Sequence, residues 1–168
     1  LPKHLILNSA KLTSSFFEIP VGANALLALP LSFIAGKMMV IRSLVNDWNL
    51  ILTDSSANPH LPEGNIHFAA FTPLQADLLI ETQFEKFNHI GTVILGGGVI
   101  STSLFNKLKK CRNRIFATYG MTETITHVAV CELKMREQDQ VFEALPGVEF
   151  FIDERGCLCI QAAHLDGG

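Results

Sequence analysis

Strand-like and helix-like segments alternate along the first 125 residues, and this order constrains the fold more than any other feature of the sequence. Short apolar runs predict strands at Ala25–Leu29, Leu50–Thr53, Ile66–Phe71, Thr92–Leu95 and Arg114–Thr118. Apolar residues at helical spacing and capping residues predict helices over Asn8–Phe17, Ala35–Asn46, Pro73 to about Phe84, and from a cap at Ser101 or Thr102 to Lys110. Strands separated by helices of this length predict parallel βαβ units, with the sheet inside and the helices outside.

The pattern changes after residue 125. Strands are expected at Thr126–Leu133, Val148–Ile152 and Cys157–Gln161, and a glycine-containing turn at Asp153–Gly156 joins the last two. The predicted fold class is therefore α/β, with a parallel sheet flanked by helices over residues 1–125 and a small, incomplete β-rich subdomain over 126–168. Because both ends interrupt the pattern abruptly, we expect the chain to be a piece of a longer protein.

Composition limits the class of protein. The 168 residues are 48% hydrophobic, which suffices for one well-buried core. The net charge is −3, and the basic residues gather only over 107–114, a solvated helix face or a phosphate-attracting patch, so nucleic acid is not an expected partner. Polar residues and Pro30 interrupt the longest apolar stretch, so we expect no membrane span. Four cysteines without C-x-x-C spacing, and no signal peptide, predict reduced thiols in the cytoplasm.

Two loops, each at the end of one of two neighbouring strands, carry the residue types that are suited to ligand binding or catalysis. Gly96-Gly97-Gly98 follows one predicted strand, and Tyr119–Thr124 follows the next. Ligands bind outside the carboxyl ends of parallel strands, and glycines let the backbone approach a flat ligand closely. The second loop adds an aromatic ring, hydroxyls and a carboxylate, which suit a base, a phosphate oxygen and a magnesium ion. The alternatives are a glycine turn that only connects two elements and a capped turn without a ligand.

The segment Tyr119-Gly120-Met121-Thr122-Glu123-Thr124 resembles the Y-G-x-T-E motif of the adenylate-forming superfamily, which includes acyl-CoA synthetases, adenylation domains of peptide synthetases and firefly luciferase. Ile94–Gly98 resembles the glycine-rich loop of the same superfamily. The resemblance implies that Tyr119 lies against adenine, that Thr122 bonds the α-phosphate, and that Glu123 binds magnesium, which makes Thr122 and Glu123 the catalytic residues. The residues that it implies for ATP or AMP binding are Gly96, Gly97, Gly98, Thr118, Tyr119, Gly120 and Thr122.

A second segment points to one branch of that superfamily. Leu29–Met39, followed by Val40–Leu44, resembles the corresponding part of o-succinylbenzoate–CoA ligases of menaquinone biosynthesis, and Phe71–Gln75 resembles their T-P-x-Q segment. Many such ligases have a histidine at the position of Phe33, so a histidine contact does not carry over, and Phe33 is expected to be a gate or a stacking residue. The resemblance implies that the acid binds near Phe33, Gly36, Lys37 and Gly98.

o-Succinylbenzoate has two carboxylates, and the one that does not react needs a cationic partner inside the protein. Lys37 and Arg42 are the cations of this apolar segment, and five helical residues separate their directions by roughly 140°. We predict Lys37 as the partner, with a solvent-facing lysine as the alternative, and we expect Arg42 to support the fold. His127, four residues after Glu123, is expected at the edge of the site, in the core or on the surface.

The resemblance implies that the parent enzyme joins ATP and a small carboxylic acid into an acyl-adenylate, which coenzyme A then converts to acyl-CoA and AMP. Leu1–Lys3 matches only the end of the family's phosphate loop, Leu165–Gly168 does not match its ribose motif, and the C-terminal domain with the adenylation lysine is absent. We therefore expect these residues to be inactive without the missing N- and C-terminal parts. Two alternatives remain: another acyl- or aryl-CoA ligase, with an alkyl chain against Met38-Met39, and a non-catalytic nucleotide-binding module.

Overall fold

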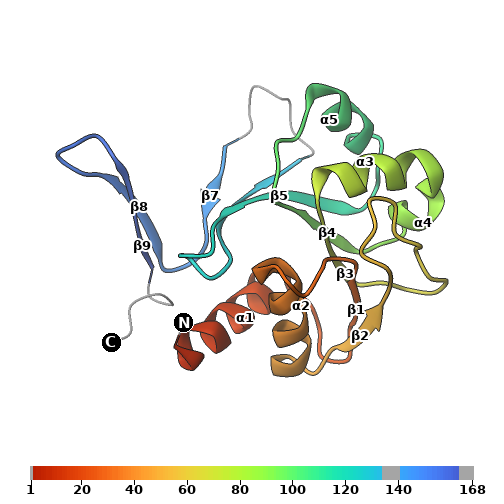
Figure 1. Cartoon of the computed structure of the whole chain (residues 1–168), viewed down its shortest axis with the longest axis horizontal. Helices are drawn as coiled ribbons and strands as arrows, with labels where there is room; N and C mark the ends of the chain where they lie inside the picture. The colour runs from red at the N-terminus through yellow and green to blue at the C-terminus, as the bar shows by residue number, and fades with distance from the viewer. Residues whose placement is uncertain (1, 134–140, 163–168) are drawn as a thin grey trace.

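A seven-stranded sheet forms the centre of the molecule (Figure 1). The structure, a computed structural model, describes residues 2–133 and 141–162. Strands follow the order β2-β1-β3-β4-β5-β6-β7; the first five are parallel, and β6 and β7 are antiparallel to their neighbours. This confirms the predicted α/β class. The bounds are β1 (Asn24–Leu27), β2 (Asn49–Leu52), β3 (Phe68–Phe71), β4 (Thr92–Leu95), β5 (Arg114–Gly120), β6 (His127–Glu132) and β7 (Glu143–Ala144).

Helices cover both faces of the sheet, as Figure 1 shows. Successive residues of a strand point to opposite faces, so on β4 Val93 and Leu95 pack with α3 to α5, whereas Ile94 packs on the side of α1 and α2. Because both faces are covered, every residue of β3 and β4 is buried. The helices are α1 (Lys3–Phe17) and α2 (Ile34–Val45) on one side, and α3 (Pro73–Thr82), α4 (Phe84–Asn88) and α5 (Thr102–Leu108) on the other.

Two helices differ from the sequence prediction. Helix α1 begins at Lys3 rather than Asn8, because no residue between them breaks a helix and because Leu5 is buried in a cluster with α2. The helix predicted to run from Pro73 to about Phe84 is two helices that separate at Gln83. The Gln83 side chain accepts a hydrogen bond from Leu61 N and donates one to Pro59 O, both at 2.9 Å. These contacts hold Gln83 outside helical geometry.

The strands after residue 125 do not all lie together. Strand β6 pairs with β5, so the main sheet continues beyond Ile125, and the two-residue strand β7, which has no apolar pattern to predict it, extends that sheet. A separate antiparallel hairpin contains β8 (Val148–Ile152) and β9 (Leu158–Ala162), which projects away from the sheet in Figure 1. The division into units at residue 125 stays a prediction, and Leu165–Gly168 lies outside the described residues.

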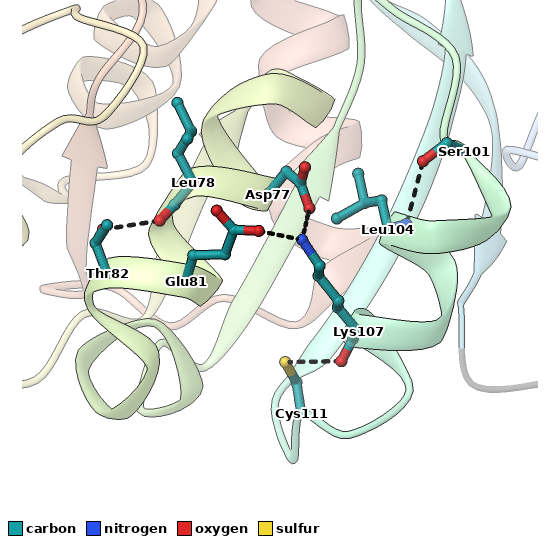
Figure 2. A network of polar contacts seen from close by, with 8 residues as sticks. All are labelled: Asp77, Leu78, Glu81, Thr82, Ser101, Leu104, Lys107 and Cys111. Atoms are coloured by element: carbon teal, nitrogen blue, oxygen red, sulfur yellow. Dashed lines mark hydrogen bonds and ion pairs between the residues drawn. The ribbon is translucent and has the colours of Figure 1, made fainter.

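Side-chain caps begin α3 and α5, which lie on the same face of the sheet. Thr72 accepts a hydrogen bond from Gln75 N at 3.2 Å while the Gln75 side chain accepts one from Thr72 N at 3.0 Å, which completes a capping box. Ser101, not Thr102, caps α5, because its hydroxyl accepts a hydrogen bond from Leu104 N at 3.1 Å (Figure 2). These caps fix where the chain turns from the sheet edge into each helix.

Lys107 joins α5 to α3. Its ammonium group lies 2.6 Å from carboxylate oxygens of both Asp77 and Glu81, which are one helical turn apart (Figure 2). Hydrogen bonds to Asp77 and Glu81 raise the pKa of Lys107 above its ordinary value. The bridge lies at the protein surface, where solvent and salt weaken such contacts. It therefore orients two helices that already share a core and adds little stability.

We expect Lys107→Met to lower the melting temperature slightly at low salt, because both ion pairs disappear. The difference from wild type should shrink at high salt, since screening already weakens the bridge. Lys110→Met is the matched control, because Lys110 lies in the turn directly after α5 and forms no ion pair among the described residues. Equal losses in both variants would mean that the bridge contributes nothing specific.

Candidate active site

The carboxyl ends of four neighbouring parallel strands open into one cavity of about 560 Å³. Its lining includes Leu29 and Pro30 after β1, Phe71 at the end of β3, and Gly96 after β4. Parallel register brings these positions to the same edge of the sheet, as the sequence predicted for the two loops. Of the residues predicted to bind nucleotide or acid, those that line the cavity are Phe33, Gly96, Gly97, Thr118, Gly120 and Thr122.

Two of the three loop glycines are required by local geometry. A Cβ at Gly96 would lie 2.7 Å from the Thr118 hydroxyl, which donates a hydrogen bond to Leu95 O at 3.0 Å. Gly97 has a φ of +75°, which L side chains rarely adopt. Gly98 meets neither condition, because an added Cβ would be at ordinary contact distance from Pro73. The close approach of β4 and β5 thus explains Gly96, and the turn explains Gly97.

Strand β5 runs two residues further than predicted, through Tyr119 and Gly120. Its pairing with β6 shifts register between these residues, and a Cβ at Gly120 would lie 2.3 Å from Thr126 O. Tyr119 stacks edge-on against Phe142 at 6.3 Å and is tilted against Phe150 at the same distance. Tyr119, the ring that the resemblance places against adenine, therefore lies on a strand. A glycine is required at the next position, because the chain passes so close to Thr126 that a side chain would collide with it.

Hydrogen bonds within the loop and the burial of one side chain fix the conformation of residues Met121 to Thr126. Thr124 Oγ1 accepts a hydrogen bond from Met121 N at 2.9 Å and lies 2.8 Å from Thr126 O, a possible acceptor for its proton. Ile125 has a φ of 68°, a strained conformation for a β-branched residue, and its side chain is fully buried between α1 and α2. Burial of Ile125 offsets the strain and directs Thr122 and Glu123 outward.

Arg42 is the cation that reaches the cavity. Its side chain is 1% exposed and lines the cavity from the buried face of α2. The guanidinium donates to Thr126 Oγ1 at 2.7 Å and to Thr13 Oγ1 at 3.2 Å, and Nη2 lies 3.5 Å from His127 Nδ1. Among residues 2–133 and 141–162, no acidic side chain pairs with it. Burial lowers the pKa of Arg42 to about 10, so Arg42 stays charged at neutral pH.

The residues predicted to contact the acid divide into two groups. Phe33 lies at the cavity, and its ring is 66% exposed. Lys37 is exposed and Gly36 is buried, and neither lines the cavity; a Cβ at Gly36 would lie 2.3 Å from Pro30 O, so packing accounts for this glycine. The assignment of Lys37 and Gly36 to acid binding stays a prediction without support from the geometry. Arg42, which we expected to support the fold, is the cation of this segment that lines the cavity.

Two further lining residues were underestimated from the sequence. His127 is buried and lines the cavity, which agrees with a core position and not with a surface one, and its part in a functional site stays a prediction. Gln75 is buried in the wall, where its amide donates to Ala28 O and to Ser56 O at 2.9 Å each. Gln75 thereby joins the end of β1 to the 55–57 loop. Its position in the T-P-x-Q segment was the only sequence signal for this role.

Three further predicted residues, Tyr119, Gly98 and Glu123, are not among those that line the cavity, and Glu123 is exposed. In the described part of the chain, no three His, Cys, Asp or Glu side chains gather as a metal site. Magnesium in phosphate-transferring sites is held by one or two carboxylates and by substrate phosphates, so one exposed Glu123 fits that chemistry. None of the described helices is long and apolar enough to cross a membrane, and the predicted cytoplasmic location stays a prediction.

The comparisons with known proteins agree with this geometry. Residues 1–161 match the family described as AMP-binding enzyme. The chain belongs to the family of AMP-binding enzymes. Similar curated proteins are the 2-succinylbenzoate–CoA ligases of Bacillus subtilis, 29% identical over 83% of this chain, and of Lactococcus lactis, 24% identical over 88%. The chain spans only 30% and 38% of the length of these two relatives, respectively.

Solved structures resemble this AMP-binding chain along its whole length. An acyl-CoA synthetase (AMP-forming)/AMP-acid ligase II-like protein from Dyadobacter fermentans is 32% identical with a TM-score of 0.91, and the match covers 100% of this chain and 49% of that one. The O-succinylbenzoate coenzyme A synthetase of Bacillus subtilis, in complex with ATP and magnesium ion, is 18% identical with a TM-score of 0.79; the match covers 99% and 38%, and this likeness shows the fold alone.

We expect Gly120→Ala to destabilise this AMP-binding chain by about 1–3 kcal/mol, because the added methyl group collides with a backbone carbonyl that cannot rotate away. Gly98→Ala is the matched control, since its methyl group meets Pro73 at an ordinary contact distance. Equilibrium unfolding in denaturant measures both. A stability for Gly120→Ala equal to that of Gly98→Ala would contradict the close approach of the β5 end to Thr126.

Proposed function

We propose that this chain supplies the acyl pocket and the adenine-binding side of an AMP-forming acid–CoA ligase whose acid is o-succinylbenzoate. The observation that carries the proposal is Arg42, a buried cation at the cavity with no acidic partner in the described residues. The family membership supports the AMP-forming chemistry. The names of the two curated relatives support the choice of acid, and menaquinone biosynthesis is the pathway that this acid implies.

A buried guanidinium requires compensation. Removing a cation from water costs several kcal/mol unless an anion or several acceptors replace the water. Arg42 has five N–H donors, and the oxygen acceptors recorded for it, Thr13 and Thr126, take two of them. Nη1 lies 3.8 Å from Met39 Sδ, and a thioether is a weak acceptor. The unused donor capacity suits a planar carboxylate, which Arg binds through two parallel hydrogen bonds.

The rest of the cavity suits an aromatic acid. Leu29, Ile34 and Phe71 provide apolar walls, and the ring of Phe33 stands at the cavity with most of its surface exposed. An aromatic substrate ring can pack against these groups while its free carboxylate meets Arg42. The other carboxylate then points toward the glycine loop and Thr122, where the nucleotide is expected. This arrangement separates the carboxylate that reacts from the one that only binds.

The nucleotide side rests on the two loops. Gly96 and Gly97 bring bare backbone to the cavity. Tyr119, between the lining residues Thr118 and Gly120 in sequence, would offer its ring to the adenine. Thr122 would donate its hydroxyl to a phosphate oxygen. Glu123 would hold magnesium together with the phosphates, and the ion would neutralise charge on the reacting oxygens. Coenzyme A as the second co-substrate follows from the resemblance alone and stays a prediction.

The alternative of an alkyl-chain acid receives less support. Met38 and Met39, which suggested such a chain in the sequence, are fully buried in two different clusters and do not line the cavity. A monocarboxylic acid would also leave Arg42 without a counter-ion. A nucleotide-binding module without catalysis would have no use for a buried cation on the acid side of the cavity.

We expect Arg42→Met to lower kcat/KM for o-succinylbenzoate by about 10–100-fold, the loss that corresponds to hydrogen bonds to a charged group. The assay uses the full natural chain that carries these residues, with ATP, magnesium, coenzyme A and a panel of acids, and follows pyrophosphate release. Benzoate, which lacks the second carboxylate, should lose little. The melting temperature should hold or rise, because an apolar residue of similar volume replaces a buried charge.

Lys37→Met is the matched control for charge, since Lys37 precedes Arg42 on the same helix but is exposed. We expect it to leave both acids unaffected. A loss of o-succinylbenzoate activity in Lys37→Met but not in Arg42→Met would reverse the assignment. Preference of the wild type for a monocarboxylic acid would refute the proposed substrate and leave the AMP-forming class in place.

We also expect the 168 residues alone to form no measurable acyl-adenylate. They correspond to 30–38% of the length of the curated relatives, and the resemblance places the phosphate loop and the adenylation lysine in the remainder. Incubation of the purified chain with ATP, magnesium and o-succinylbenzoate tests this by acyl-adenylate detection. Formation of the adenylate above the rate of a Thr122→Val, Glu123→Gln double variant would contradict the expectation.

A further inference from the structure

We propose that Thr13, a buried residue of α1, is a positioning residue that aims the Arg42 guanidinium into the cavity and so sets the preference for acids with a second carboxylate. The inference rests on the proposed function, because it assigns the support of the same anion site. Thr13 does not itself belong to the cavity lining, and the hydrogen bond from Arg42 Nε is the tie to the site that the described residues show. Its role is therefore indirect.

The direction of the hydrogen bonds at Thr13 is determined. Its side chain is 1% exposed, and its hydroxyl donates to Ser9 O, four residues earlier on α1, at 3.1 Å. A hydroxyl has one proton, so this bond leaves only lone pairs for the Nε–H of Arg42 at 3.2 Å. Thr13 is thus a fixed acceptor in a helix, and its orientation does not depend on the ligand.

Two fixed acceptors define the plane of the guanidinium. Thr13 receives Nε–H from one side, and Thr126, next to β6, receives an N–H of Nη2 at 2.7 Å. The five N–H groups of arginine lie in one rigid plane, so holding two of them sets the direction of the others. Without Thr13, rotation about the last side-chain torsions is restrained at Thr126 alone. The N–H groups of Arg42 that we assign to the carboxylate would then lose their fixed orientation, although the positive charge would remain.

Ser43 provides a matched comparison within the same helix pair. Its hydroxyl is also buried and donates to the carbonyl four residues earlier, Met39 O, at 3.0 Å. Unlike Thr13, it receives no recorded hydrogen bond from Arg42 in the described structure. Removal of either hydroxyl costs a helix one side-chain-to-backbone bond. Only the loss of Thr13 should alter the anion site.

The test uses Thr13→Val, which replaces the hydroxyl by a methyl group of similar size, in the full natural chain that carries these residues. We expect kcat/KM for o-succinylbenzoate to fall about 10-fold, the effect of one hydrogen bond to a charged group. The change should lie mainly in KM, because the second carboxylate binds equally in the ground and transition states. Activity with benzoate should change less than about 2-fold, since benzoate makes no use of this contact.

Three variants complete the experiment. Thr13→Ser keeps the acceptor and should restore the ratio of kcat/KM between the two acids to near the wild-type value. Ser43→Ala should leave that ratio unchanged while lowering the melting temperature to a similar extent as Thr13→Val. Thr13→Ala removes the acceptor without placing a methyl group against the guanidinium. If the valine variant does not fold, the alanine variant should show the same fall in kcat/KM for o-succinylbenzoate.

The inference is overturned if folded Thr13→Val or Thr13→Ala keeps the wild-type ratio, or if both acids lose activity equally. Failure of the proposed function looks different: the wild type then shows no preference for o-succinylbenzoate, or the preference survives Arg42→Met. In either case no selectivity acts through Arg42 for Thr13 to set, and the inference falls with the proposed function. A loss confined to o-succinylbenzoate in Arg42→Met and Thr13→Val, and absent in Ser43→Ala, supports both.

Discussion

One buried guanidinium connects the three segments that close the inner side of the cavity. Arg42 extends from α2, donates to Thr13 on α1, and donates to Thr126 at the beginning of β6. These segments are distant in sequence, and Arg42 is the hydrogen-bonding group that they share. A buried cation in such a place is costly, and its neighbours provide neutral oxygens rather than a carboxylate. Arg42 thus links both helices to the strained loop through neutral oxygens, and no acidic side chain of the described residues balances its charge.

The loop that contains the strained residue Ile125 is the second feature that shapes this side of the cavity. Ile125 adopts a left-handed conformation at a cost of order 1–3 kcal/mol, and Gly120 comes so close to Thr126 that a side chain would collide with it. Both features persist because Ile125 is buried with Leu5, Ala10 and Met38 under the two helices. Core packing on one side of the loop thus fixes the direction of Thr122 and Glu123 on the other.

Sequence reasoning predicted the βαβ order well because each element has a local signal. Strand Thr92–Leu95 is a short apolar run before glycines, and Thr72-Pro73 is a helix start with its own cap, so neither needs knowledge of its neighbours. The break at Gln83 depends on Leu61, which is distant in sequence, and the extension of β5 depends on its pairing with the following strand, β6. No periodicity within the segment reports such partners.

The different surroundings of Lys37 and Arg42 have the same explanation. Lys37 stands beside Gly36 in the segment that resembles the acid-binding motif, and from sequence its charge is equivalent to that of Arg42. The two differ in which side of α2 faces the sheet. That side is set by Met38 and Met39, which are buried in different clusters, and Arg42 follows them by one turn. A lone arginine on a buried helical face is ordinarily counted as a fold-supporting residue, and only the cavity beside it distinguishes the two roles.

Under the proposed function, we expect the ligand-free and the ligand-bound protein to differ in stability because of Arg42. Arg42 is charged, buried and paired only with hydroxyls, an imidazole and a thioether in the described structure, so part of its desolvation cost is uncompensated. Under the proposed function, a carboxylate that binds beside Arg42 would provide the missing compensation, and binding to the folded state alone would raise stability by mass action. An acid without a second carboxylate would occupy the same apolar walls and leave that cost in place. The proposed selectivity for a dicarboxylate would thus arise from an incomplete ion pair that the fold maintains at some expense to its own stability.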